Sequence, residues 1–183
     1  MNTERLKIRW AHLFNEEMHK FFVNKNVLDI GCLNGYSTNQ FFKHNAKNVI
    51  GIDINPKYVD EAIKNYSNIV FKLQDAEEID NFKEIDVVSC LGLIYFLKDP
   101  IKFLKKLAIQ ENANTVIIET VFNNDKTYLN DDLYYLNINT IKTIFIDNNW
   151  KISFEKFFKL KQINDNKNFN FGDRIIIVFE RQL

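Results

Sequence analysis

The stretch that most constrains the fold is residues 26–37, which reads NVLDIGCLNGYS. Its apolar run contains Asp29 and ends at a turn with Gly31 and Gly35, and a segment compatible with a helix begins near Tyr36. A buried strand, a glycine turn and a helix N-terminus are typical of an open α/β sheet that holds a nucleotide-like cofactor at the carboxyl end of a strand. Asp53 ends the next apolar run, about twenty residues on, where such folds bind a ribose.

The rest of the chain alternates between apolar runs and helical patterns. Further strands are predicted at residues 69–73, 85–91 and 115–119, with helices at 35–44, from Asn55-Pro56, from Asp99-Pro100 and at 140–148. Two β-like runs, 151–160 and 173–180, close the chain as a hairpin. The pattern predicts an α/β, Rossmann-like sheet of seven strands, mostly parallel, with helices on both faces and a C-terminal antiparallel β-hairpin. With no repeat or linker, we expect a single domain over residues 1–183.

Residues 1–24 are predicted to form an amphipathic helix ahead of the first strand. Two interpretations stay open: a helix that only packs against the core, or a lid over the cofactor with Arg9 or Trp10 facing the site. The apolar positions at helical spacing are Leu6, Trp10, Leu13, Phe14, Met18, Phe21 and Phe22.

Composition excludes several classes of function. The 24 basic and 24 acidic residues balance, so we do not expect a nucleic-acid partner or attraction to an anionic membrane. No signal peptide or membrane span is recognised. Two cysteines, Cys32 and Cys90, form no disulfide framework, and a reduced, cytoplasmic protein is expected. With only three histidines beside them, no metal site is predicted. A monomer or homodimer is expected.

The charge at the turn distinguishes between two classes of cofactor. Dinucleotide sites usually read G-x-G-x-x-G, whereas here Leu33 stands where a middle glycine could be. Asp29, just before the turn, would repel a pyrophosphate. It would suit S-adenosylmethionine, which carries an ammonium and a sulfonium, with a carboxylate to meet the helix N-terminus. The residues therefore favour S-adenosylmethionine.

Five stretches, in order, resemble the motifs of class I S-adenosylmethionine-dependent methyltransferases. VLDIGCLNGYS resembles the first motif, commonly D-x-G-C-x-x-G, and GIDINPKYV, LQDAEEI, IDVVSCLGLIYFLKDP and TVIIET resemble the segments at strands two to five. The resemblance covers about residues 26–120 and implies binding of S-adenosylmethionine, with S-adenosylhomocysteine as product. The cofactor-binding residues that follow are Asp29, Gly31, Cys32, Gly35, Asp53, Ile54, Asp75, Ala76, Cys90 and Leu91.

A narrower resemblance is to the branch that contains the tRNA wobble-uridine carboxymethyltransferase. GLIYFLKDP, IIETVFNNDKTYL and YYLNINTIKTIFIDNNW carry it. The chain keeps Tyr95, Glu119 and Asn137 of that branch, but it has Phe96 in place of a histidine and Leu136 in place of a proline. It also lacks that enzyme's long N-terminal extension and a basic patch for phosphates. The shared segments are therefore interpreted as a shared scaffold.

The catalytic candidates are Glu119, Tyr95 and His12. Tyr95, Glu119 and Tyr135 should lie at or beyond the carboxyl edge of the sheet, and His12 could reach it if the N-terminal helix is a lid. Glu119 or Tyr95 would serve as a base if the acceptor must lose a proton. The aromatic connection at residues 121–137 is expected to border the substrate.

We therefore predict an S-adenosylmethionine-dependent methyltransferase that methylates a small-molecule acceptor by in-line displacement. One alternative is a tRNA-modifying methyl- or carboxymethyltransferase, which would need a positive residue for the extra carboxylate. Another is a non-catalytic subunit that binds only the cofactor.

Overall fold

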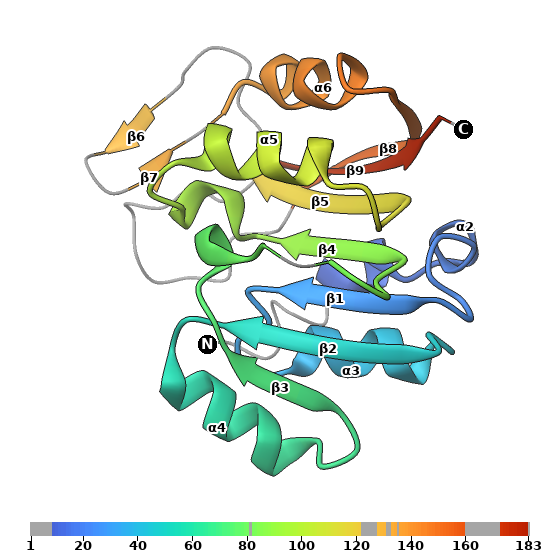
Figure 1. Ribbon diagram of the computed structural model, residues 1–183, viewed down its shortest axis with the longest axis vertical. Coiled ribbons are helices and arrows are strands. Elements are labelled where there is room, and N and C mark those ends of the chain that lie inside the picture. Colours follow the sequence, from blue (N-terminus) through green and yellow to red (C-terminus); the bar gives the residue numbers. More distant parts are fainter. Residues whose placement is uncertain are drawn as a thin grey trace.

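The computed structural model describes residues 9–80, 82–121, 128–130, 133–134, 136–159 and 173–182 (Figure 1). Its main sheet has seven strands in the order β3-β2-β1-β4-β5-β9-β8. The strands of this sheet are β1 (Asn26–Ile30), β2 (Asn48–Asp53), β3 (Val70–Leu73), β4 (Val87–Leu91), β5 (Thr115–Val121), β8 (Trp150–Lys159) and β9 (Asp173–Arg181). β1 to β5 are parallel, and the hairpin β8–β9 adds antiparallel strands beside β5. The predicted fold class is confirmed.

The helices α4 and α5 begin at the caps predicted from the sequence. The α-helices are α2 (Glu16–His19), α3 (Tyr36–Lys43), α4 (Pro56–Asn65), α5 (Pro100–Ile109) and α6 (Ile138–Ile146), with 3₁₀ turns η1 (Ala76–Glu78) and η2 (Ile94–Phe96). At the start of α4, the Asn55 side chain accepts a hydrogen bond from the Lys57 amide at 3.0 Å. At the start of α5, Asp99 accepts one from Lys102 at 2.9 Å. In both helices the proline takes a first-turn position, where it needs no hydrogen-bond donor.

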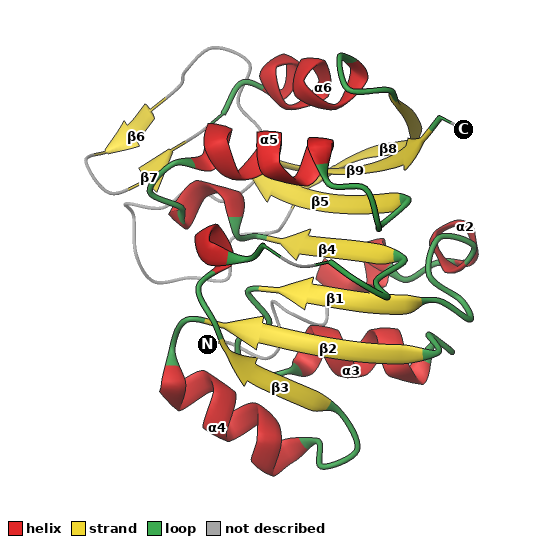
Figure 2. Ribbon diagram, viewed as in Figure 1, coloured by secondary structure: helices red, strands yellow, loops and turns green. Residues whose placement is uncertain are grey.

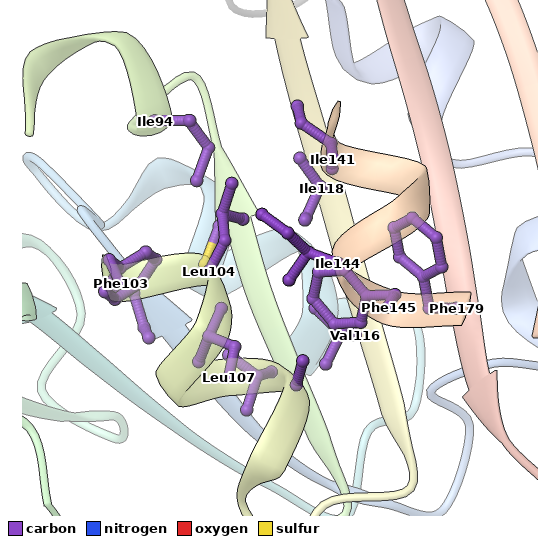
Figure 3. Close-up of a cluster of buried hydrophobic side chains, with 14 of the residues drawn as sticks. Ile94, Phe103, Leu104, Leu107, Val116, Ile118, Ile141, Ile144, Phe145 and Phe179 are labelled. Atoms are coloured by element: carbon purple, nitrogen blue, oxygen red, sulfur yellow. The ribbon is translucent and has the colours of Figure 1, made fainter. Parts of the chain in front are cut away.

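The sheet is buried on both faces by separate hydrophobic clusters. On one face, α5 and α6 pack over β4, β5 and β9, and Phe145 stacks on Phe179 with ring centroids 4.2 Å apart (Figure 3). On the other face, α3 and the N-terminal helical segment cover β1 and β5 with Trp10, Phe22 and Phe41. Burial on both faces explains why the strands read as nearly continuous apolar runs.

The parallel arrangement brings several strand ends to one edge. The arrowheads of β1 to β5 point to the same side of the sheet (Figure 2). Because β9 runs antiparallel to β5, its first residues lie at that edge too, with Arg174 opposite Val121. Residues far apart in the sequence therefore meet where ligands bind in open α/β sheets.

Two segments differ from the sequence prediction. The N-terminal helix is interrupted: residues 9–13 are helical, and Asn15 then caps the short α2, accepting a hydrogen bond from the Met18 amide at 3.1 Å. This side-chain cap starts a new helix where helical spacing alone predicted a continuous one. In the connection at 121–137, β6 (Tyr128–Asn130) and β7 (Leu133–Tyr134) pair as an antiparallel ribbon. Residues 1–8 and Tyr135 lie outside the described residues.

Within the described residues, no helix combines the length and the apolar character needed to cross a membrane.

Candidate cofactor and active site

The glycine turn between β1 and α3 is held in a conformation that side chains disfavour. Gly31 and Gly35 have φ angles of 76° and 79°, and Leu33 has 50°. A Cβ on Gly35 would lie 2.7 Å from the Phe71 ring, so glycine is required there for space as well as for its backbone angle. The positive φ of Leu33 is a strained backbone state of the kind that clusters at ligand sites. No side chain caps α3, so its first N–H groups face this edge unpaired within the helix.

Asp29 is a buried carboxylate whose hydrogen bonds come from neutral hydroxyl groups. It is 1 % exposed and accepts hydrogen bonds from Ser37 Oγ at 2.7 Å and Thr38 Oγ1 at 2.8 Å, both in the first turn of α3. Burial raises its pKa to about 6, although the hydroxyl donors and the charge of Arg9 act in the opposite direction. Among the described residues, no basic side chain forms an ion pair with it. The carboxylate therefore lacks the cation that would stabilise its charged form.

Asp53 connects the end of β2 to the glycine turn. Its Oδ2 accepts a hydrogen bond from the Leu33 amide and its Oδ1 one from the Asn55 amide, each at 2.9 Å. The first bond stabilises the unusual backbone of Leu33. Each carboxylate oxygen keeps a further lone pair, so a structural role and ribose binding are compatible. The adjacent Ile54 is 64 % exposed and offers an apolar surface at this edge.

Of the remaining predicted cofactor residues, Cys32 is buried in the glycine turn, and the others lie at neighbouring strand ends. Asp75 accepts a hydrogen bond from the Glu77 amide at 2.8 Å and thereby caps η1, whose first residue, Ala76, is buried. Cys90 and Leu91 are buried at the end of β4. Burial raises the pKa of the Cys90 thiol well above its usual range, and Cys90 is therefore not a thiolate nucleophile.

Glu119, at the end of β5, is bound by two arginines. Arg9 Nη2 contacts Glu119 Oε2, and Arg174 Nε contacts Oε1; Arg174 Nη2 also donates to Oε2 at 2.9 Å. Although Glu119 is fully buried, the two guanidinium groups lower its pKa. A carboxylate with a lowered pKa and occupied oxygens is a weak proton acceptor, which disfavours the predicted role of Glu119 as a base.

Tyr95 belongs to the same cluster, whereas His12 is placed elsewhere. Arg174 Nη2 donates to the Tyr95 hydroxyl at 3.2 Å, and its guanidinium carbon lies 5.6 Å from the Tyr95 ring centroid. His12 stacks on Phe158 of β8, with ring centroids 5.1 Å apart. The structure therefore brings Tyr95 and Glu119 together and leaves His12 against the hairpin.

Arg9 and Arg174 complete the site, and the sequence analysis assigned neither of them to Glu119. Arg174 is the second residue of β9 and precedes an apolar run, and Glu119 lies near the end of the apolar β5. A buried acid in β5 and a basic residue beside the apolar run of β9 are the signal that could have suggested an ion pair. Arg9 comes from the N-terminal helical segment and fills the space where a Cβ of Gly92 would lie. Gly92, with φ 71°, therefore allows Arg9 to reach Glu119.

These groups fit S-adenosylmethionine better than a dinucleotide. Asp29 lacks a cationic partner, which an ammonium would supply, and the uncapped N-terminus of α3 suits a carboxylate. Asp53 retains lone pairs for ribose hydroxyls. A pyrophosphate bound at the same turn would be repelled by the buried Asp29 carboxylate.

The chain matches a protein family whose model is described as "Methyltransferase domain", over residues 22–167. Curated relatives include tRNA U34 carboxymethyltransferases from Nautilia profundicola, 34% identical over 66% of this chain and 42% of that protein, and from Campylobacter fetus, 30% identical over 67% and 46%. The chain thus spans about half the length of these curated relatives.

Solved structures share the fold at low sequence identity. The N-methyltransferase NodS from Bradyrhizobium japonicum, in complex with S-adenosylhomocysteine, superposes with a TM-score of 0.77 at 17% identity, covering 98% of this chain and 88% of NodS. An S-adenosylmethionine-dependent methyltransferase from Listeria monocytogenes, described as putative, gives a TM-score of 0.72 at 16% identity over 100% of both chains.

Proposed function

We propose, from the premise that the chain belongs to the methyltransferase domain family, that it is a cytoplasmic S-adenosylmethionine-dependent enzyme that methylates a small-molecule acceptor. The observation that carries the proposal is Asp29. A buried carboxylate with no cationic partner among the described residues, beside a glycine turn and an uncapped helix, suits a ligand with an ammonium and a carboxylate.

Each part of the ligand has a protein group that fits it. Asp29 would meet the ammonium, the start of α3 the carboxylate, and Asp53 the ribose hydroxyls. Asp75 and Ala76 would border the adenine. When bound, S-adenosylmethionine supplies an electrophilic methyl group and leaves as a neutral thioether, so no general acid is required. The protein must then align the acceptor with the methyl group and exclude water.

Tyr95 is the group proposed to meet the acceptor. Its hydroxyl accepts a hydrogen bond from Arg174, which fixes the phenol at this edge of the sheet, and a phenol can both accept and donate hydrogen bonds to an acceptor oxygen or nitrogen. Glu119 then keeps the two arginines in place. This assignment suits an acceptor whose nucleophile is already deprotonated or needs only a weak base.

A panel of small acceptors, scored by release of S-adenosylhomocysteine, tests the proposal. Turnover that is lost in Asp29→Asn and reduced in Tyr95→Phe is the expected result. Binding of S-adenosylmethionine without turnover on any acceptor would favour the non-catalytic alternative. No binding at all would contradict the proposal.

A second candidate is carboxymethyl transfer to tRNA, and one observation favours it. Arg9 and Arg174 share the single carboxylate of Glu119, which leaves one positive charge in excess in this cluster. A carboxylated donor needs a positive residue for its extra carboxylate, and this excess charge would supply one. The names of the curated relatives point the same way and weigh against excluding nucleic acid as a partner.

The donor that the protein prefers distinguishes methyl transfer to a small acceptor from carboxymethyl transfer to tRNA. Purified protein would be assayed with S-adenosylmethionine and with its carboxylated analogue, each with small acceptors and with unmodified tRNA. The second candidate predicts a preference for the carboxylated donor that falls in Arg9→Gln, and RNA binding that weakens with salt. Equal or better activity with the unmodified donor, together with no RNA binding, would exclude it.

A further inference from the structure

Two histidines are in direct contact away from the cofactor site. His19, the last residue of α2, and His44, the C-terminal cap of α3, lie with Nε2 and Nδ1 2.7 Å apart. Both are partly exposed. Phe14 stacks on His44 with centroids 5.2 Å apart, and Phe22 meets His19 edge-on at 5.5 Å. The two rings are thus held against each other by aromatic packing while remaining accessible to solvent.

The pair lies at the opposite end of α3 from the glycine turn. Gly35 caps the start of this helix and His44 its end. The backbone that follows His44 is held in place by a hydrogen bond, which the Asn24 amide donates to the Asn45 carbonyl at 2.8 Å. The pair is therefore separate from the groups assigned to cofactor and acceptor.

The contact requires that one of the facing nitrogens carry no proton. Two imidazolium rings would present two N–H groups to each other, whereas two neutral rings can form one N–H···N bond. Burial and the neighbouring His19 both lower the pKa of His44, which favours the neutral form. A neutral imidazole nitrogen is also the form that binds transition metals.

The spacing is close to that of two metal ligands. Zinc binds histidine nitrogen at about 2.0–2.1 Å in tetrahedral geometry, which places two neighbouring ligand nitrogens about 3.3 Å apart. The two facing nitrogens, 2.7 Å apart, therefore need to separate by only about 0.6 Å, with a rotation of the rings. The outer nitrogens, His19 Nδ1 and His44 Nε2, have no hydrogen-bond partner among the described residues, so either can take the proton displaced from the contact.

We infer that His19 and His44 form a two-histidine site for a divalent first-row transition ion such as zinc or nickel. The ion replaces the shared proton, which moves to an outer nitrogen of the same ring, so the neutral pair releases no net proton. Because the described residues hold no group of three or more His, Cys, Asp or Glu suited to a metal, water completes the coordination and the affinity is micromolar. The bound ion links α2 to α3.

Zinc titration of untagged protein by calorimetry tests this inference. One ion per chain is expected, with the affinity reduced at least roughly tenfold in His19→Gln and in His44→Gln. His12→Gln, which alters the one histidine outside the pair, should bind zinc as the wild type does. Zinc should also raise the melting temperature of the wild type and not that of His44→Gln.

A spectroscopic measurement covers the case in which a variant folds poorly. With one equivalent of Cu²⁺, the electron paramagnetic resonance spectrum of the wild type should show two coordinated imidazole nitrogens. Absence of zinc binding up to millimolar concentration, or binding that survives in both pair variants, would overturn the inference. Neither result bears on S-adenosylmethionine binding, which is measured separately.

Discussion

Two acids at the same edge of the sheet have opposite electrostatic surroundings. Asp29 and Glu119 both lie near the carboxyl ends of parallel strands, and both are almost completely buried. Asp29 is hydrogen-bonded by two hydroxyl groups, and burial raises its pKa to about 6. Glu119 is bound by two guanidinium groups, which lower its pKa despite the same degree of burial.

The difference indicates which of the two acids is suited to bind a cationic ligand. The charge of Glu119 is more than offset by Arg9 and Arg174, so this residue is a structural anchor that holds both arginines. Asp29 forms no ion pair among the described residues, and the charge of Arg9 does not offset its burial, so Asp29 gains most from a cationic ligand. Burial alone would not distinguish the two residues; their partners do.

Removal of the Glu119 charge should have the largest effect on stability. Glu119→Gln leaves two arginines without their shared counter-charge, of which Arg174 is 3 % exposed, and breaking a buried ion pair in this way costs about 3–5 kcal/mol. Urea unfolding measures the loss. Glu111→Gln, at an exposed position, is the matched control and should change little. A loss below about 1 kcal/mol would mean that the cluster does not anchor the fold.

Removal of the Asp29 charge should stabilise the ligand-free protein, in contrast to removal of the Glu119 charge. A folded pKa raised from 3.8 to about 6 means that Asp29 contributes stability below pH 3.8, which is lost as the pH rises through about 6. At pH 8, Asp29→Asn should therefore make the ligand-free protein more stable by about 3 kcal/mol. The gain should disappear near pH 4, and binding of S-adenosylmethionine should be lost.

Denaturant unfolding at a series of pH values checks this prediction. Asp147→Asn, which alters an exposed acid, should leave the pH dependence unchanged. A destabilised Asp29→Asn protein at pH 8 would show that the carboxylate is already balanced without a ligand.

Gly92→Ala should have the smallest effect of the three. The new Cβ would adopt a φ of 71° and would occupy the space of the Arg9 guanidinium. The strained backbone costs about 1–2 kcal/mol, and displacement of Arg9 adds to it. In an Arg9→Gln background, the cost of displacing the guanidinium should vanish and only the cost of backbone strain should remain. The same cost in both backgrounds would show that Gly92 serves only the backbone.

The local parts of the site were predictable from the sequence, and the long-range parts were not. Asp29, the two turn glycines and the start of α3 lie within twelve residues, so their spacing defines the turn. The two arginines approach Glu119 from residues 110 and 55 positions away, and their meeting depends on strand order and on the path of the N-terminal segment. The interruption at Asn15 was missed because an apolar stripe does not reveal a side-chain cap.

The pairing of His19 with His44 was hidden for the same reason. From its sequence position alone, His44 is expected to be exposed at the far end of the helix at residues 35–44. The structure makes it only partly exposed, because α2 folds back to cover it. Helical periodicity predicts which face of each segment is apolar, but it does not predict which other segment packs there.

The most direct test is calorimetric titration of S-adenosylmethionine in buffers of different ionisation enthalpy. At pH 6, where Asp29 is about half protonated, a ligand ammonium should drive out about half a proton per site. At pH 8 the release should vanish while binding persists, and Asp29→Asn should show neither heat nor proton release. Binding with no proton release at pH 6, or binding unchanged in Asp29→Asn, would contradict the account of Asp29 as the acid that awaits a cationic ligand.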